Sequence, residues 1–241
     1  MTATYKTLIF TDSRGKGLAR FIENYDTPDD IFYILEIRPG WSLARFAPRI
    51  IEVLNEHNID SIYCMVFAGI CGLTERSVEA NVRMLRYPSD SRDTKVNKTC
   101  DTIRSLKDQF KSHINIATII PADLEAYFKF HNPGNPVPEF LAAEQAALEY
   151  DIATINGIIT FINCGVIRNL NLINWITLKS KKKRQRSGSR VAYRKVAKLS
   201  YRDFKDGVHF AENLKLVFFR LLLQISIKDI DARLRPAHNS P

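Results

Sequence analysis

Two short stretches of the sequence carry side chains that could together perform nucleophilic catalysis. Ser13 follows the apolar run "TLIF" in the turn "TDSRG", so its hydroxyl would lie at the end of a buried strand. Near the other end, "YRDFKDGVHFAEN" places Asp206 and His209 three residues apart, just before an apolar helix. A loop with this spacing can turn the imidazole toward the serine and keep the carboxylate behind it, where it fixes the tautomer and stabilises the imidazolium. The residues predict a triad of Ser13, His209 and Asp206, with ordinary turn chemistry as the alternative for each stretch.

The elements that would position these residues alternate along the chain. Strands and helices in alternation indicate one doubly wound, flavodoxin-like α/β domain over residues 1–241, with three layers and a mostly parallel five-stranded sheet. In such sheets a site forms at the carboxyl ends of the strands, and the first three predicted strands end in "TDSRG", "RPG" and "AGICG". We expect residues 75–98 to be polar and irregular. Apolar runs predict strands at 7–10, 30–40, 61–74, 114–121 and 173–178, and helices at 17–25, 41–59, 101–113, 138–163 and 211–224.

These stretches resemble the sequence blocks of the SGNH (GDSL-type) hydrolase superfamily. They occur in the same order as in that family and extend over nearly the full length of the chain. The Gly-Asp-Ser block of that family is matched by Thr11-Asp12-Ser13, and its Asp-x-x-His block by Asp206-Gly207-Val208-His209. The resemblance implies that Ser13 is the nucleophile, that His209 is the general base, and that Asp206 orients the imidazole. It also implies that no cofactor and no metal take part.

The resemblance further implies an oxyanion hole formed by the backbone N–H groups of Ser13 and Gly40 and by the residue at position 71. This chain departs from the family pattern there, because Cys71 replaces an asparagine whose amide donates to the oxyanion. A thiol is a weak donor, and the loss of one oxyanion donor can lower kcat by about 10²–10³. Thr11 replaces the usual first glycine of the block, which should change the turn but not the chemistry.

Charge and composition indicate which class of protein this chain belongs to. Apolar residues make up 45% and charged residues 25% of the chain, as in globular proteins. The N-terminus has no cationic start followed by an apolar core, and no run is long enough for a membrane span, so we predict an intracellular protein, cytoplasmic or nuclear. The four cysteines form no CxxC pair, which predicts a reduced compartment without a structural metal.

The net charge of +9 comes from one segment. Residues 179–198 hold ten of the 35 Lys and Arg and no acid, which leaves 25 basic against 26 acidic residues, a charge of −1, elsewhere. Such a run is typical of a solvated loop, and it also fits a nuclear-import signal, an acidic membrane surface or a nucleic-acid patch. The basic residues proposed for that contact are Lys181, Lys182, Lys183, Arg184 and Arg186.

Two functions follow from the sequence. The first is a serine hydrolase that cleaves a small acyl ester, either an O-acetyl or a lipid ester. The second is a catalytically weak or inactive SGNH-like module that binds nucleic acid or an acidic partner through residues 179–198, whose deletion should then abolish polyanion binding. The sequence leaves the acyl group, the alcohol and the oligomeric state open.

Overall fold

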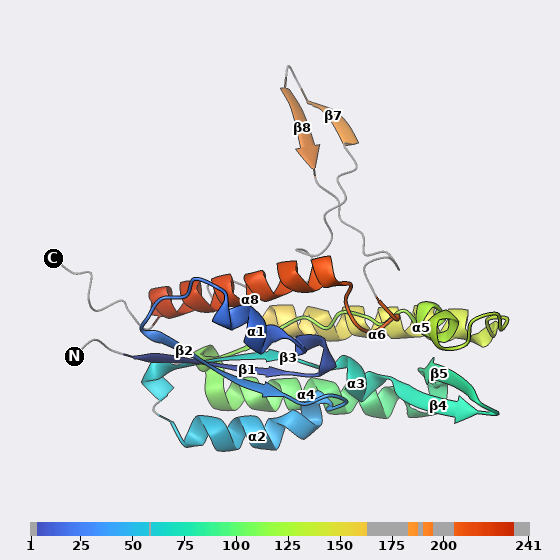
Figure 1. Ribbon diagram of the computed structural model, residues 1–241, viewed down its shortest axis with the longest axis horizontal. Coiled ribbons are helices and arrows are strands. Elements are labelled where there is room, and N and C mark those ends of the chain that lie inside the picture. The colour runs from blue at the N-terminus through green and yellow to red at the C-terminus, as the bar shows by residue number, and fades with distance from the viewer. Residues whose placement is uncertain (1–3, 58, 163–182, 188–189, 195–204, 234–241) are drawn as a thin grey trace.

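The centre of the protein is a parallel sheet whose strands end at one edge. The computed structural model describes residues 4–57, 59–162, 183–187, 190–194 and 205–233. The sheet has the order β2-β1-β3-β6 (Figure 1), and Thr11 at the end of β1 lies opposite Ile37 of β2 and Phe67 of β3. The carboxyl ends of these three strands therefore coincide, as a site at that edge requires. The four strands are β1 (Tyr5–Thr11), β2 (Ile31–Ile37), β3 (Ile62–Phe67) and β6 (Ile114–Ile116).

Helices cover both faces of the sheet, which gives three layers (Figure 1). All six residues of β3 are buried, because alternate side chains enter opposite cores. Cys64 and Val66 join one core with α2 and α4, whereas Met65 joins the other with α1 and α8. The helices are α1 (Leu18–Glu23), α2 (Leu43–Asn55), α4 (Arg92–Phe110) and α8 (Glu212–Arg233).

Two further helices complete the body. α6 (Phe140–Ile162) packs against α4, and it also contacts α5 (Leu124–His131), which lies against strand β5 (Val82–Arg86). The sequence predicted α6 but missed α5, which begins where the Asp123 side chain accepts a hydrogen bond from the N–H of Ala126. This cap fixes the start of the helix beside the candidate site.

The region 75–98 is more regular than the sequence predicted. β4 (Glu75–Glu79) and β5 form an antiparallel hairpin, and α4 already begins at Arg92, nine residues before the expected start. The two turn residues, Ala80 and Asn81, both have positive φ, as a two-residue hairpin turn demands. Because four of the five β4 side chains are exposed, the strand has no apolar pattern that the sequence could display.

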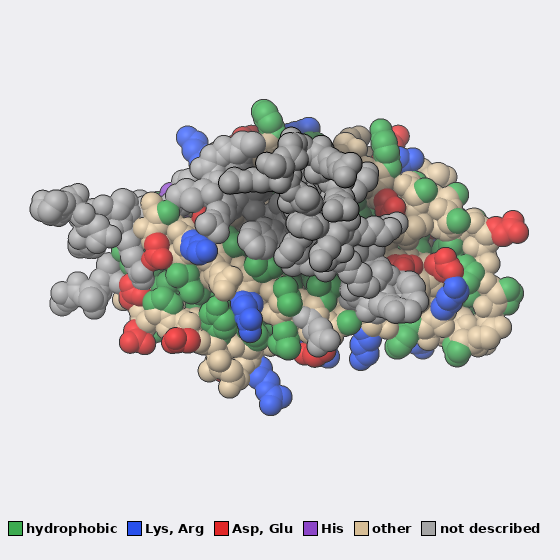
Figure 2. Space-filling view, turned by 90° about the horizontal axis from the view of Figure 1, so that it is seen from above, with side chains coloured by type: hydrophobic (Ala, Val, Ile, Leu, Met, Phe, Trp, Pro, Cys, Tyr) green, Lys and Arg blue, Asp and Glu red, His purple; other side chains and the backbone are tan. Residues whose placement is uncertain are grey.

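The last helix and the basic segment also differ from expectation. α8 was expected to be too apolar on all sides for a surface helix, yet Leu216 and Val217 are 43% and 48% exposed. Figure 2 shows the face on which α8 lies, where hydrophobic side chains reach the surface among charged ones. The predicted strand at 173–178 lies outside the described residues, so the described parallel sheet has four strands. Within 179–198 the structure describes an antiparallel hairpin of β7 (Lys183–Ser187) and β8 (Arg190–Arg194).

Candidate active site

Ser13 stands in a tight turn directly after β1. The turn is a short 3-10 helix, Ser13–Gly15, and the Asp12 side chain caps it by accepting a hydrogen bond from the Arg14 N–H at 2.9 Å. A Cβ on Gly15 would lie 2.0 Å from the Thr11 methyl carbon, so Thr11 fits here only because residue 15 lacks a side chain. The departure from the family pattern at position 11 is thus accommodated within the turn. Ser13 itself is half-buried, which leaves its hydroxyl within reach of a substrate.

Asp12 lies beneath this turn and is almost completely buried. Burial is the main influence on its pKa and raises it, while the charge and the backbone N–H of Arg14 act in the opposite direction. Its second carboxyl oxygen accepts a weak hydrogen bond from the Cys71 thiol at 3.8 Å. Asp12 therefore connects the turn that carries Ser13 to the segment that follows β3.

The Asp206–His209 loop has the geometry of an acid that orients an imidazole. Asp206 Oδ2 lies 2.7 Å from His209 Nδ1, and Oδ1 accepts hydrogen bonds from the N–H groups of Val208 and His209 at 3.1 and 2.8 Å. Burial raises the pKa of Asp206, but the hydrogen bonds from the His209 ring and from these backbone groups outweigh it and hold the pKa well below its usual range. An ionised carboxylate only accepts hydrogen bonds, so Nδ1 of the neutral ring carries the proton and Nε2 is its basic atom.

Ser13, Asp206 and His209 line one cavity of about 890 Å³. The structure therefore brings together side chains from opposite ends of the chain, at the edge where β1 ends. Within the described residues, the lining of this cavity does not include Gly40 or Cys71.

Gly40 and Cys71 lie on the turns that follow the neighbouring strands. Gly40 is exposed, and its turn is joined to β1 by a hydrogen bond of 2.9 Å from the N–H of Arg38 to the carbonyl of Thr11. Cys71 belongs to the short helix α3 (Ile70–Leu73). This helix lies close to the start of α2, where a Cβ on Gly72 would lie 2.9 Å from Cβ of Ser42. Burial is the main cause that raises the pKa of Cys71 to about 11, so the group is a thiol near neutral pH.

Arg14 is a buried residue of the candidate site that sequence analysis missed. Its guanidinium group is buried and donates to the carbonyls of Val208 at 3.0 Å, Ile120 at 2.7 Å and Pro121 at 3.3 Å. It also lies 5.2 Å from the centre of the Phe210 ring. The residue next to Ser13 thus contacts both the loop of Asp206 and His209 and the segment after β6. A charged residue in a surface-type turn gives no sequence signal that its side chain points inward.

Gly207 holds the same loop from the other side. Its carbonyl accepts a hydrogen bond of 2.7 Å from the N–H of Asp123, at the start of α5. Its φ is +79°, and a Cβ there would lie 2.3 Å from the Asp123 carbonyl oxygen and 2.4 Å from the Tyr127 nitrogen. The Asp-x-x-His loop therefore fits against α5 only with glycine at this position.

Gly207→Ala should lower the free energy of unfolding by at least about 2 kcal/mol, because the positive φ and the forced overlap both cost energy. Gly134→Ala is the matched control, since Gly134 has a φ of +87° but nothing within 4 Å of its Cβ position. Urea unfolding of both variants measures the difference. Equal losses would contradict the idea that close contact with α5 fixes the triad loop.

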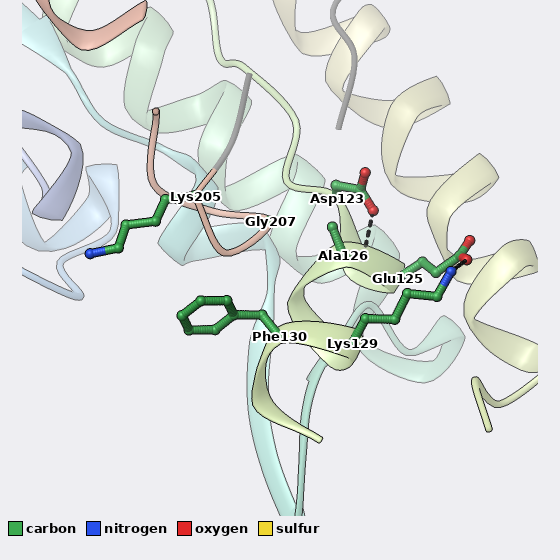
Figure 3. Close-up of a pocket in the computed structure, with 7 residues that line it drawn as sticks. All are labelled: Asp123, Glu125, Ala126, Lys129, Phe130, Lys205 and Gly207. Atoms are coloured by element: carbon green, nitrogen blue, oxygen red, sulfur yellow. Dashed lines mark hydrogen bonds and ion pairs between the residues drawn. The ribbon is translucent and has the colours of Figure 1, made fainter. Parts of the chain in front are cut away.

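Beside this cavity lies a second one of about 700 Å³, between the triad loop and α5 (Figure 3). Lys205 lines both cavities. The other residues around the second cavity are Asp123, Glu125, Ala126, Lys129, Phe130 and Gly207.

The remaining predicted residues and site types can be placed as follows. Lys183, Arg184 and Arg186 belong to β7, whereas Lys181 and Lys182 lie outside the described residues, and binding of nucleic acid by this segment stays a prediction. Within the described part of the chain, no group of three or more His, Cys, Asp or Glu side chains is arranged to hold a metal ion. None of the described helices combines the length and the apolar character needed to cross a membrane.

Comparison with known proteins identifies the fold. No protein-family model matches the sequence, and no curated protein sequence matches it. A lipase/acylhydrolase from Enterococcus faecalis is 16% identical over 98% of this chain and 100% of its own, with a TM-score of 0.55. Two catalytic mutants of an acetylxylan esterase from Geobacillus stearothermophilus are 13% identical over 93% of this chain and 95% of theirs, with TM-scores of 0.51 and 0.52. The chain therefore has the α/β fold of the SGNH-type ester hydrolases.

Proposed function

We propose that this protein is a serine hydrolase that cleaves carboxylic esters with Ser13 as its nucleophile. The observation that carries the proposal is the single cavity lined by Ser13, Asp206 and His209, in which Asp206 and His209 are already joined at 2.7 Å. A nucleophile, a base and a group that orients the base are the parts that an acyl transfer needs. Fold alone would not support this activity, because one fold serves many functions.

In the proposed reaction, Ser13 Oγ attacks the ester carbonyl carbon while His209 Nε2 takes the hydroxyl proton. The tetrahedral intermediate collapses when the bond to the alcohol oxygen breaks, and the proton on Nε2 passes to the departing alcohol. Water then attacks the acyl-serine with His209 again as the base, which releases the carboxylic acid and restores Ser13. Asp206 keeps its charge throughout and stabilises the imidazolium, in agreement with its lowered pKa.

The oxyanion would be held by backbone N–H groups of Ser13 and Gly40, with Cys71 as a weak third donor when its thiol proton turns away from Asp12 Oδ2. The substrate is proposed to be a small acyl ester, with an O-acetyl or a lipid acyl group. The named activities of the similar structures, a lipase/acylhydrolase and an acetylxylan esterase, agree with this class.

Covalent labelling tests the proposal directly. A fluorophosphonate probe should label the folded protein at Ser13 alone, as located by peptide mass spectrometry, and His209→Ala should abolish the labelling. His131→Ala is the control, since His131 is a second histidine near the site, on α5, whose ring packs on Tyr127 at 4.3 Å between centres. No labelling of the native protein, or labelling that persists without His209, would overturn the proposal.

Cys71→Asn should raise kcat for ester hydrolysis about tenfold or more, because an amide donates a stronger hydrogen bond to the oxyanion than a neutral thiol does. Cys71→Ala serves as the control for the mere loss of the thiol, since alanine has no donor in its side chain. Steady-state kinetics with p-nitrophenyl acetate measures the effect. Equal kcat values in all three proteins would show that residue 71 does not contact the oxyanion.

A further inference from the structure

The cavity around Ser13 and His209 is bordered by an excess of positive charge. Near neutral pH the only negative lining group besides Asp206, among the described residues, is Glu212. The charged side chains of the lining outside the triad are Arg14, Lys16, Lys205, Lys215 and Glu212.

Two of these cations already interact with other groups of the protein. Arg14 is buried and donates to three backbone carbonyls, so it faces away from the solvent of the cavity. Lys215 forms an ion pair of 2.9 Å with Glu212. Among the described residues, no carboxylate forms an ion pair with Lys16 or with Lys205. These two exposed ammonium groups flank the triad, one from the nucleophile turn and one from the triad loop.

The two acids that line the second cavity together with Lys205 are occupied by other groups. In the second cavity, Asp123 caps α5 through the N–H of Ala126, and Glu125 forms an ion pair with Lys129. Figure 3 shows Lys205 extending away from all of these side chains. Its charge is therefore not compensated from the side of α5.

Lys215, which is already paired with Glu212, also lies beside the turn that carries Ser13. Its Nζ lies 3.6 Å from the position that a Cβ would take on Gly17, so the side chain of α8 rests against the residue after Lys16. Since Glu212 lines the same cavity, this pair adds no net charge there. Among the described residues, the ammonium groups without a carboxylate partner in the cavity that holds Ser13 are therefore those of Lys16 and Lys205.

From this arrangement we propose that the site prefers ester substrates that carry a negatively charged group a few atoms from the ester carbonyl, and that Lys16 and Lys205 bind this group. The inference rests on the proposed ester hydrolase function and names its substrate class. Positive charge around a cleft raises the local concentration of anions and their rate of encounter. A neutral acyl ester would gain nothing from these lysines.

Matched esters that differ only in charge test the preference. The first pair has the charge on the acyl side and consists of the anionic p-nitrophenyl half ester of adipic acid and its neutral methyl ester. The second pair has the charge on the alcohol side and consists of anionic 4-acetoxybenzoate and neutral methyl 4-acetoxybenzoate. At low ionic strength, kcat/KM should be about tenfold higher for the anionic member of at least one pair. This factor corresponds to the combined free energy of two exposed ion pairs. The ratio should fall toward one as salt shortens the Debye length to about 3 Å at 1 M.

Charge reversal connects the preference to the two lysines. The double variant Lys16→Glu, Lys205→Glu should invert the ratio of the two kcat/KM values. Lys228→Glu is the matched control, because Lys228 is exposed on the same helix as Lys215 but about 20 Å further along it at 1.5 Å per residue. It reverses one charge, as each substitution of the double variant does, and should leave the ratio unchanged. Equal rates within both pairs, or an unchanged ratio in the double variant, would overturn the inference.

A binding experiment separates this inference from the proposed function. Calorimetric titration of Ser13→Ala with 4-acetoxybenzoate and with the adipic half ester needs no turnover, and at least one should bind about tenfold more tightly than its methyl ester. If the fluorophosphonate probe did not label Ser13 but the anionic ligands still bound more tightly than their methyl esters, only the hydrolase function would be overturned. Labelling of Ser13 without any charge preference in binding or kinetics would overturn only the substrate class.

Discussion

Ser13→Ala should lower kcat for ester hydrolysis by about 10⁴-fold or more, because the covalent acyl-enzyme route is lost and only binding and oxyanion contacts remain. The variant should keep its fold, since no hydrogen bond of the described structure depends on the Ser13 hydroxyl and the turn is capped by Asp12. Hydrolysis of p-nitrophenyl acetate, with thermal unfolding measured in parallel, separates the two effects.

Ser89→Ala provides the control for this experiment. Ser89 is exposed in a separate turn between β5 and α4, so its replacement should change neither the rate nor the stability. If Ser13→Ala kept most of the wild-type rate, the nucleophile would have to be another group. Cys71 would be a poor replacement, because its thiolate is scarce at neutral pH when the pKa is about 11.

Asp206→Asn should lower kcat by about 10³–10⁴-fold with little change in KM, because an amide NH₂ facing Nδ1 would force the wrong tautomer on His209. The carbonyl oxygen of the new amide can still accept the hydrogen bonds from the N–H groups of Val208 and His209, so the loop should keep its shape. Asp101→Asn, at an exposed position on α4, is the control for the loss of one carboxylate.

The Asp206→Asn variant should also differ from the wild type in how its free energy of unfolding depends on pH. The folded pKa of Asp206 lies below its unfolded value of about 3.9, so its charge stabilises the fold above that pH. This contribution disappears as the pH falls through the folded pKa. The difference in unfolding free energy between wild type and Asp206→Asn should therefore be constant near neutral pH and shrink below about pH 4. A difference that persists unchanged at low pH would mean that the carboxylate charge does not stabilise the loop.

The sequence determined the class of fold and the strands that matter. The runs at 7–10 and 61–74 identified β1 and β3, because a strand buried on both faces is a nearly continuous apolar run. The predicted strand at 61–74 was too long, since β3 ends at Phe67 and residues 70–73 form the short helix α3. β4 and α5 escaped prediction for the opposite reason. Most of β4 is exposed, and α5 begins at a cap whose significance appears only when its neighbours are known.

The candidate triad likewise depends partly on local sequence and partly on long-range packing. The residue types and spacing were enough to single out Ser13, Asp206 and His209, since the Asp-x-x-His spacing lets a local loop form the 2.7 Å contact by itself. That Ser13 shares a cavity with them is a long-range property, which depends on β1 lying in the middle of the sheet. The contributions of Gly40 and Cys71 to an oxyanion hole stay predictions.

The sequence by itself thus determined which side chains are candidates for catalysis and the order in which strands and helices alternate. Only the tertiary structure decided that Arg14 points inward to join the turn of Ser13 to the loop of Asp206 and His209, and that Gly207 must lie against α5. It also decided that Lys16 and Lys205, far apart in the chain, border one cavity. Local residue patterns fix local structure, whereas burial and proximity depend on which distant segments pack together.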